Sequence, residues 1–360
     1  MTTNILFFIA GLITLIVGAD LLVRGASRLA AAFGVAPLVI GLTIVAIGTA
    51  SPEIAVSLQA AAAGQGDLTL GNVLGSNIFN ILVILGVTAI VAPITIAEQL
   101  IRKDAPIVLG ISLLTFVLAF DGKLSWQDGA MLLIGLIAYM SFAIRQSQLE
   151  SKKVQKEYAK EFAPKEKKTI LNNSINLVFI LIGLALLVLG SNWLVESATQ
   201  IAKSLGVSEL VIGLTIVAVG TSLPEVATSV MAALKGESDI AVGNAIGSNI
   251  FNLLGVLGIG AVAAPDGIAV TSRVLQFDLP VMIFVALVTL PVFYIDSRIS
   301  RFEGSLLMSY YIIYVIYVIM RATESSALPN YAIFISVFVP CTFFVLSAAA
   351  FRSMHARKSR

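Results

Sequence analysis

Residues 38–86 have the sequence "LVIGLTIVAIGTASPEIAVSLQAAAAGQGDLTLGNVLGSNIFNILVILG". It returns at residues 210–258 as "LVIGLTIVAVGTSLPEVATSVMAALKGESDIAVGNAIGSNIFNLLGVLG", aligned without a gap at an offset of 172. About 30 of the 49 aligned positions are identical, and these include Gly, Thr, Pro, Glu, Asn and Ser residues. Apolar character alone would not place those residues at the same positions, so the chain carries an internal repeat.

Composition indicates an integral membrane protein. The 360 residues are 58% hydrophobic and only 12% charged, whereas soluble domains carry about 25% charged residues. The mean hydropathy is +0.96. The single cysteine, Cys341, and the single histidine, His355, exclude a disulfide framework, a Cys or His zinc site and a Ser-His triad within the chain. The basic residues form no stripe or groove, so we expect no nucleic-acid partner.

The apolar segments are long enough to cross a bilayer, which takes about 20 residues each. The first follows an uncharged "MTTN" and has no clear cleavage site, so it is interpreted as a span and not as a signal peptide. We expect about eleven transmembrane helices, at residues 4–30, 37–63, 68–91, 105–120, 127–146, 172–202, 209–234, 240–264, 277–296, 303–320 and 329–351. The predicted fold is an all-α polytopic membrane protein.

The repeat divides the chain into two five-span halves, residues 1–147 and 171–322. A lysine-rich polar segment, residues 148–170, joins them and is interpreted as a solvated cytoplasmic linker; residues 323–360 add one C-terminal span and a basic tail. The repeated motifs fall on four expected helices, termed the motif helices, at 37–63, 68–91, 209–234 and 240–264. Because five spans separate the copies, the copies enter the membrane from opposite sides. Such an inverted repeat is typical of secondary transporters.

The basic residues predict the orientation. With the linker in the cytoplasm, the N-terminus lies outside and the C-terminal tail inside. Of the 23 Lys and Arg residues, only Lys123, Lys203, Arg273 and Arg321 then fall outside, and 19 fall inside. This follows the positive-inside rule. We therefore expect a multi-pass protein of the plasma (inner) membrane in contact with membrane lipid, while the sequence leaves the oligomeric state open.

A proline interrupts the first motif helix of each copy. Pro52 and Pro224 cannot donate to the carbonyls four residues earlier, at Gly48 and Gly220. A freed carbonyl inside a membrane must be satisfied by another group, and a cation in a cavity would satisfy it. Each copy therefore predicts a broken helix that exposes backbone oxygen.

A glutamate follows each proline. An ionisable residue at the centre of a membrane helix costs about 2.5–3.5 kcal/mol on insertion scales. Two of them in matching positions, Glu53 and Glu225, predict a shared function. Hydroxyl and amide groups recur at four-residue spacings: Thr49 before Glu53, Thr221 before Glu225, Ser76 before Asn80 and Ser248 before Asn252.

Two further features of the "GSN" signature concern packing. The glycines before the serines, Gly75 and Gly247, would allow neighbouring helices to approach closely. Asn77 and Asn249, one residue past the serines, point to another face of the helix. Whether they bind a ligand or join helices stays open at this point.

The available donors predict the class of ligand. Carboxylates, hydroxyls, amide carbonyls and backbone carbonyls are all hard oxygen donors, and calcium takes 6–8 oxygens at about 2.3–2.6 Å. No soft ligand is present, which disfavours copper and zinc. A site with a net charge of −2 would suit one calcium ion, two or more sodium ions, or two protons. Competition among these for the same carboxylates would make the protein an antiporter, with no cofactor and no enzymatic activity.

On these motifs the sequence resembles the cation/calcium exchanger superfamily, which includes the sodium/calcium exchangers. The resemblance covers about 320 residues, with a "GT(S)xPE" helix followed by a "GNxxGSNIFN" helix in each half. It implies that the motif helices surround the ions at the midplane and that the spans at 4–30 and 172–202 slide against them. Carried over by position, the ion ligands would be Glu53, Thr49, Ser76 and Asn80, then Glu225, Thr221, Ser222, Ser248 and Asn252, with backbone oxygens of Ala46 and Ala218.

The sequence departs from the family pattern at three places. Ala50 stands where the second copy has Ser222, so one hydroxyl is missing. Asn80 and Asn252 are both amides, whereas several sodium/calcium exchangers carry an aspartate at one of these positions. The third departure is the span at 329–351, which exceeds the ten-span pattern. The first two departures put a three-sodium stoichiometry in doubt.

The expected function is calcium/sodium antiport by alternating access. Proton/calcium exchange is the closest alternative, although the proton-coupled branch of the family typically has "GNxxEL" where this chain has "GNVLGSN" and "GNAIGSN". Potassium-dependent sodium/calcium exchange also stays open. A passive calcium channel is disfavoured because channels typically place rings of ligands around a pore. A membrane aspartyl protease, suggested by "GQGD" at 64–67, lacks a second catalytic aspartate in a plausible partner helix.

Overall fold

The computed structural model describes residues 2–33, 35–149, 170–205 and 218–358, and these ranges are almost entirely helical. Nine of the described helices are long and apolar enough to cross a membrane, and the bent pair Pro37–Thr49 and Ser51–Ala62 passes the same test when its two helices are taken together as one span. The expected span at 209–234 begins outside the described residues, and the expected linker at 148–170 lies almost wholly outside them. The predicted all-α polytopic fold is confirmed.

The first half of the chain runs from α1 to α8. Its elements are α1 (Thr2–Phe33), α2 (Pro37–Ile40), η1 (Gly41–Val45), α3 (Ala46–Thr49), α4 (Ser51–Ala62), α5 (Gly66–Phe79), η2 (Asn80–Ile84), α6 (Leu85–Val91), β1 (Ile94–Thr95), η3 (Leu100–Asp104), α7 (Ala105–Leu118), η4 (Ala119–Asp121), β2 (Lys123–Leu124) and α8 (Trp126–Leu149). Segments η1, η2 and η3 are π-helical. Each forms part of a longer helical run, as π-bulges commonly do.

The second half repeats this order. Its described elements are α10 (Ile170–Ser204), α12 (Ala218–Gly220), α13 (Leu223–Leu234), α14 (Ser238–Phe251), η6 (Asn252–Val256), α15 (Leu257–Ala263), β3 (Ile268–Ala269), η7 (Val274–Asp278), α16 (Leu279–Tyr294), β4 (Arg298–Ile299), α17 (Arg301–Ala322) and α18 (Leu328–Lys358). The π-helical segment η6 begins 172 residues after η2, since 252 − 80 = 172. The backbone therefore repeats at the same offset as the sequence.

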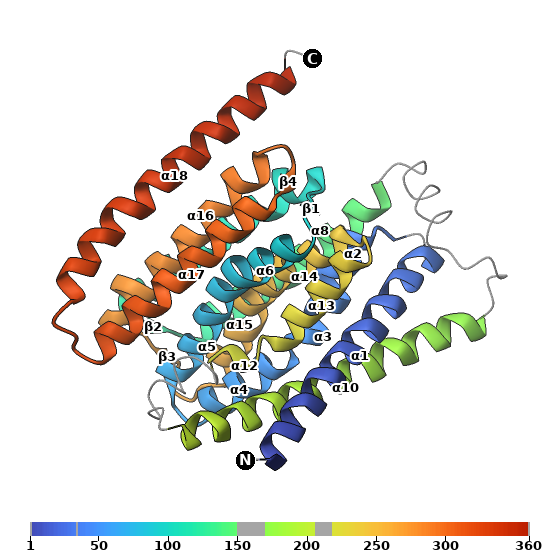
Figure 1. Ribbon diagram of the computed structural model, residues 1–360, viewed down its shortest axis with the longest axis horizontal. Coiled ribbons are helices and arrows are strands. Elements are labelled where there is room, and N and C mark those ends of the chain that lie inside the picture. The colour runs from blue at the N-terminus through green and yellow to red at the C-terminus, as the bar shows by residue number, and fades with distance from the viewer. Residues whose placement is uncertain (1, 34, 150–169, 206–217, 359–360) are drawn as a thin grey trace.

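Two short strand pairs join connections that the span order places on the same side of the membrane. β1 pairs with β4, and β2 pairs with β3, both antiparallel. The two pairs lie at opposite ends of the helical bundle (Figure 1). Each pair therefore connects a loop of one half to a loop of the other half.

The helices that carry the "GSN" signature form the centre of the bundle. The spans α5–α6 and α14–α15 are the most deeply buried of the described helices. Their side chains join one large apolar cluster that also includes residues of α7, α8, α16 and α17. Polar groups on these two spans are therefore held deep inside the protein, away from lipid.

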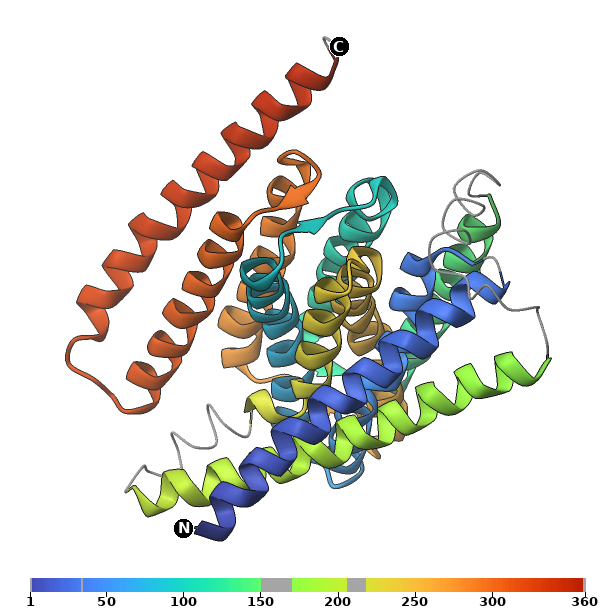
Figure 2. The same cartoon turned by 45° about the vertical axis from the view of Figure 1, so that its right-hand side comes forward.

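Helices α1 and α10 pack against each other along one edge of the bundle (Figures 1 and 2). Their contact is made by glycines. A Cβ added at Gly11 would lie 2.9 Å from the carbonyl oxygen of Gly190, and one added at Gly18 would lie 2.9 Å from that of Gly183. Small residues of this kind let two membrane helices approach backbone to backbone. We refer to α1 and α10 together as the α1/α10 pair.

An ion pair joins the α1/α10 pair to a motif helix. The Nζ atom of Lys235, just after α13, lies 2.7 Å from Oδ1 of Asp20 in α1, and it also donates to the Asp20 carbonyl oxygen at 3.0 Å. Arg24, one turn further along α1, holds the other oxygen of Asp20 at 2.7 Å. At the repeat-related positions stand Asn192 and Ala63, which cannot form an ion pair. This connection therefore exists at one end of the bundle only.

Helix α18 is the additional span, and it lies along the edge opposite to the α1/α10 pair (Figure 2). It contacts α16 and α17: the Tyr310 hydroxyl lies 2.6 Å from the Thr342 hydroxyl, and the rings of Phe284 and Phe343 are 5.6 Å apart. None of the site residues expected from the sequence lies on α18.

Candidate functional site

Two broken helices carry the glutamates. In the first copy α3 ends at Thr49, the axis bends by 50°, and α4 begins at Ser51. In the second copy α12 ends at Gly220 and α13 begins at Leu223. Each proline is the second residue of a new helix, where its missing N–H breaks no hydrogen bond. The break that the prolines predict is present in both copies.

Each glycine carbonyl at the breaks accepts a hydrogen bond from a hydroxyl, so it does not need a cation to satisfy it. The Gly48 oxygen accepts a hydrogen bond from the Ser51 hydroxyl at 2.7 Å, and the Gly220 oxygen accepts one from Ser191 of α10, also at 2.7 Å. A hydroxyl within reach satisfies a freed carbonyl as well as an ion would. Of the two backbone positions expected to bind ions, Ala46 accepts from the Ala50 N–H at 3.0 Å, and Ala218 begins α12.

The two glutamates are buried in the first turns of α4 and α13. Glu53 and Glu225 are each 1% exposed. The Ser222 hydroxyl donates to Oε1 of Glu53 at 3.0 Å and lies 3.4 Å from the Ser76 hydroxyl. In the described part of the chain, neither glutamate forms an ion pair with Lys or Arg. Two carboxylates are therefore buried without basic partners.

The threonine of the first copy faces the second copy. The Thr49 hydroxyl lies 3.1 Å from the Val45 carbonyl oxygen and 3.1 Å from Oδ1 of Asn244. Thr49 ends α3 and Glu53 lies in the first turn of α4, so the helix break at Ala50 stands between the two residues. Thr221 lies in the corresponding break between α12 and α13.

Two repeat-related asparagines donate hydrogen bonds to the backbone carbonyl oxygens of the glutamates. Asn72 of α5 donates through Nδ2 to the Glu53 carbonyl oxygen at 3.3 Å and to the Ser57 hydroxyl at 2.9 Å. In the second copy, Asn244 of α14 donates to the Glu225 carbonyl oxygen at 3.2 Å and to the Ser229 hydroxyl at 3.0 Å. The contacts join the two motif helices within each copy.

Sequence reasoning missed these asparagines and serines. Each is identical between the two copies, as the Asn of "GNxxGSN" and as the Ser four residues after each glutamate. That identity is the signal that could have found them. It is a weak signal, because many other polar residues of the repeat are also identical.

The second motif helices place amides from both copies together. Asn80 and Asn252 begin the π-helical segments η2 and η6. Asn80 donates through Nδ2 to Oδ1 of Asn249 at 3.0 Å, and Asn249 donates to the Asn77 carbonyl oxygen at 3.3 Å. Asn249 therefore joins α14 to α5. Of the two roles left open by the sequence, ligand binding or a contact between helices, the structure shows the contact between helices for Asn249. Ser76 and Ser248 are buried one turn before Asn80 and Asn252.

The close approach expected at the "GSN" glycines occurs in one copy only. A Cβ added at Gly247 would lie 2.7 Å from both Cα and O of Leu42, so η1 packs directly on α14 there. A Cβ added at Gly75 would meet nothing within 4 Å, so the expectation is wrong for that glycine. The two copies therefore differ in how tightly they are packed.

Several oxygen atoms around the glutamates are buried and have no hydrogen-bond donor. Among the predicted ion ligands they are Oε2 of Glu53, Oε2 of Glu225, Oδ1 of Asn80, Oδ1 of Asn252, Oγ1 of Thr221 and Oγ of Ser248. A buried polar atom without a partner costs about 1–3 kcal/mol. These six atoms come from both copies, and Oδ1 of Asn77, which is not a predicted ligand, is likewise buried without a partner. Hard oxygens that lack donors form a suitable environment for a cation.

The sequence matches the family described as "Sodium/calcium exchanger protein" over residues 3–145 and 175–320. These ranges include every helix from α1 to α17 except for parts of their ends, and they leave out α18. The residues between the two matched ranges contain the expected linker.

Similar proteins span most of the chain. It is 39% identical over 318 residues to "Putative antiporter CaxA" of Alkalimonas amylolytica, covering 87% of this chain and 98% of that protein. It is 34% identical over 352 residues to "Sodium/calcium exchanger MaX1" of Methanosarcina acetivorans, covering 88% and 98%. Among solved structures, the sodium-calcium exchanger NCX_Mj superimposes with a TM-score of 0.74 at 32% identity, covering 87% of this chain and 98% of that one.

Proposed function

Because this chain belongs to the sodium/calcium exchanger family, whose members are cation/calcium antiporters, we propose that it exchanges calcium for sodium across the plasma (inner) membrane. The exchange site would lie between the four motif helices. Its ligands would come from Glu53 and Glu225, the hydroxyls of Thr49, Thr221, Ser222, Ser76 and Ser248, the amides of Asn80 and Asn252, and the backbone oxygens of Ala46 and Ala218.

The observation that carries this proposal is a pair of buried carboxylates without basic partners in the described residues. Each is 1% exposed, and each has one oxygen that accepts no hydrogen bond. Buried charges in proteins are paired or bind metal ions, because an isolated buried charge is very costly. In the described part of the chain, no cluster of three or more His, Cys, Asp and Glu side chains is arranged to hold a metal ion. The charge of the site is therefore supplied by Glu53 and Glu225 together.

Exchange follows from competition for these two charges. One calcium ion neutralises both carboxylates, and two sodium ions neutralise them equally well. If the empty, uncompensated site is costly to rearrange, the protein changes conformation only when the site is filled. Ion movement in one direction is then tied to ion movement in the other direction.

The α1/α10 pair supplies a means of alternating access. The close packing at its glycines would let the two helices move as one unit across the motif helices. The two copies differ in exposure: Asn72 and Pro52 are half-buried, whereas Asn244 and Pro224 are buried. The ion pair between Asp20 and Lys235 lies on the more buried side. This asymmetry supports a conformation in which the site is approached along α4 and closed along α13.

The proposed orientation places the open side outside the cell. With the basic linker in the cytoplasm, α4 lies in the outer half of the membrane and α13 in the inner half. The halves at 1–147 and 171–322 would then act as the two gates, one for each side.

Flux measurements in proteoliposomes test this proposal. Vesicles containing the purified protein are loaded with sodium, and uptake of radioactive calcium is followed at a clamped membrane potential. Calcium should accumulate above its equilibrium level when sodium is high inside the vesicles. A proton gradient of the same size should drive little calcium uptake. Accumulation with a proton gradient alone would instead identify proton/calcium exchange, and calcium entry that never exceeds equilibrium would identify a channel.

A further inference from the structure

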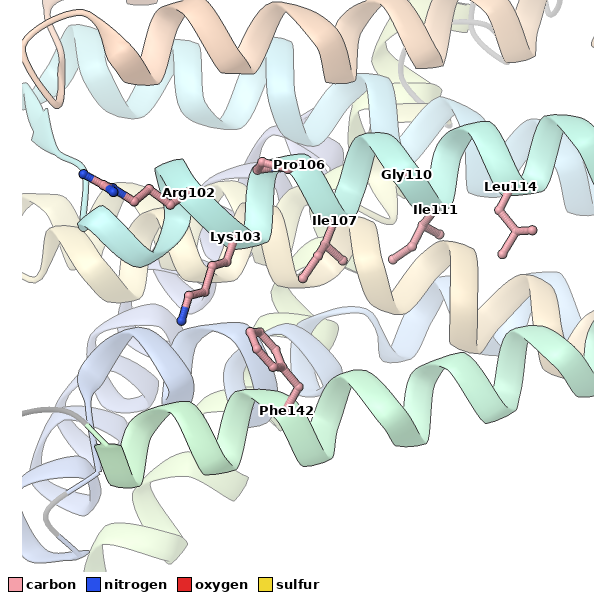
Figure 3. A pocket seen from close by; sticks show the side chains of 8 residues that line it. All are labelled: Arg102, Lys103, Pro106, Ile107, Gly110, Ile111, Leu114 and Phe142. Carbon is pink, nitrogen blue, oxygen red and sulfur yellow. The ribbon is translucent and has the colours of Figure 1, made fainter. Parts of the chain in front are cut away.

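A groove lies on the surface of the bundle between α7 and α8, away from the candidate exchange site. Its volume is about 680 Å³, and eight residues line it: Arg102, Lys103, Pro106, Ile107, Gly110, Ile111, Leu114 and Phe142 (Figure 3). All but Phe142 come from η3 and α7. Arg102 and Lys103 lie at one end, and the other lining residues are apolar or glycine. The groove is therefore amphipathic along its length.

The basic end lies at a membrane surface. Arg102 and Lys103 stand at the beginning of a span that continues to Asp121, and the Lys103 ammonium donates to Oε1 of Gln146, near the end of α8, at 2.6 Å. This is the end of α8 that leads to the expected cytoplasmic linker. The apolar part of the groove, from Ile107 to Leu114, runs from this surface towards the middle of the membrane.

Lys103 is available to an anion. It contacts neutral groups, the Gln146 amide and the Phe142 ring, whose centroid lies 5.7 Å from Nζ. Among the described residues it forms no ion pair, whereas Arg102 is paired with Glu98 at 2.7 Å. The adjacent carboxylate, Asp104, accepts hydrogen bonds from Gln99 and Tyr139 instead. Among the described residues, Lys103 is therefore the basic group of the groove without an ion-pair partner, and its charge is offset only through its electrostatic interaction with the neighbouring Asp104.

Gly110 keeps the apolar part of the groove open. A Cβ added there would meet no atom within 4 Å, because α7 faces empty space at that point. Ile107, Ile111 and Leu114 lie on either side of it along α7 (Figure 3). A flexible hydrocarbon chain would fit along this surface.

We propose that this groove binds an anionic phospholipid, with its phosphate on Lys103 and Arg102 and an acyl chain along Ile107, Gly110, Ile111 and Leu114. Charge complementarity at the surface end and an apolar surface below it match the two parts of such a lipid. Basic pockets between membrane helices on the cytoplasmic side are sites of this kind. Because residues of both α7 and α8 line the groove, the bound lipid would contact both helices and stabilise their packing in the first half.

Lipid retention by the full-length, purified protein tests the proposal. Phosphatidylglycerol and phosphatidylcholine with the same acyl chains are added in detergent, and bound lipid is measured by native mass spectrometry. Wild type should retain phosphatidylglycerol in clear preference to phosphatidylcholine. The variant Lys103→Gln should lower its affinity about fivefold, the equivalent of about 1 kcal/mol for one basic residue near an anionic headgroup. The matched control Lys123→Gln, which removes a lysine at the other membrane surface, should change the affinity less than twofold.

A second variant separates the acyl-chain contact from the headgroup contact. A Cβ added at Gly110 meets no atom within 4 Å, so we expect the Leu side chain of Gly110→Leu to occupy the groove and displace both lipids while the protein stays monodisperse. Inorganic phosphate at the same concentration should not compete with the phospholipid, because it lacks the acyl chain. Equal retention of the two lipids by wild type, or unchanged phosphatidylglycerol binding in both Lys103→Gln and Gly110→Leu, would overturn the proposal.

Discussion

The hydroxyl of Ser222 donates a hydrogen bond to Oε1 of Glu53 at 3.0 Å, across 169 residues of sequence. The serine belongs to the helix break of the second copy, and the glutamate belongs to the first turn after the break of the first copy. This contact, together with those of Thr49 to Asn244 and Asn80 to Asn249, brings both copies to a single site. The site is therefore a product of the repeat and not of either half alone.

The contact predicts the effect of Ser222→Ala. The substitution removes a donor to a buried carboxylate and one oxygen from the proposed ligand set. A hydrogen bond to a charged group contributes about 1.5–3 kcal/mol, so the calcium affinity should fall by about tenfold or more. Calcium titration of the purified protein by calorimetry would measure this. Ser51→Ala is the matched control, because Ser51 lies at the other break but is exposed and bonds only backbone carbonyls. Equal effects of the two variants would contradict the assignment.

The asparagines of the two copies should not be equivalent. Asn244 is fully buried and also accepts from Thr49 of the other copy, whereas Asn72 is half-buried and donates within its own copy. Asn244→Ala should therefore destabilise the protein more, by about 1–3 kcal/mol in the free energy of unfolding, because it leaves buried donors and acceptors unpaired. Thermal unfolding of both variants in detergent would compare them. A larger loss of unfolding free energy in Asn72→Ala than in Asn244→Ala would contradict this prediction.

The ion pair of Asp20 and Lys235 should favour the conformation described above. Both side chains are about one quarter exposed, so the pair is worth only about 0.5–1 kcal/mol. Lys235→Gln should then shift the conformational population about two- to fivefold towards closure along α4. Labelling of Ser51→Cys by a membrane-impermeant thiol reagent, in a Cys341→Ser background, should slow accordingly.

Arg24→Gln is the control for that experiment. Arg24 also pairs with Asp20, but both residues lie in α1, so its removal does not release α1 from α13. Labelling should stay at the rate of the parent protein. If Lys235→Gln and Arg24→Gln behave alike, the connection between α1 and α13 does not control access.

Much of the fold follows from the sequence because membrane spans and repeats are strong signals. A span is a long apolar run, and a duplicated polar string such as "GSNIFN" is enough to indicate the symmetry of the two halves. The prolines predict the broken helices for a local reason that does not depend on packing.

Contacts between the copies could not be predicted in this way. Thr49 bonds to Asn244, and Ser191 donates to the Gly220 carbonyl oxygen. Both hydrogen bonds depend on how helices that are distant in sequence pack together. Gly247 is tightly packed and Gly75 is not, and the nearly identical sequences around them do not predict this difference. Spacing places residues on a face of one helix, but the partner of that face is decided by tertiary structure.

We propose that Glu53 and Glu225 together form one site that calcium and sodium share. Binding of radioactive calcium to the purified protein tests it most directly, with wild type, Glu53→Gln, Glu225→Gln and the surface control Glu98→Gln, each with and without sodium. Glu98 is exposed and paired with Arg102, so Glu98→Gln should bind like wild type. Sodium should displace calcium from wild type, and either site variant should lose calcium binding while remaining folded. Calcium binding at wild-type affinity in either Glu53→Gln or Glu225→Gln would contradict it.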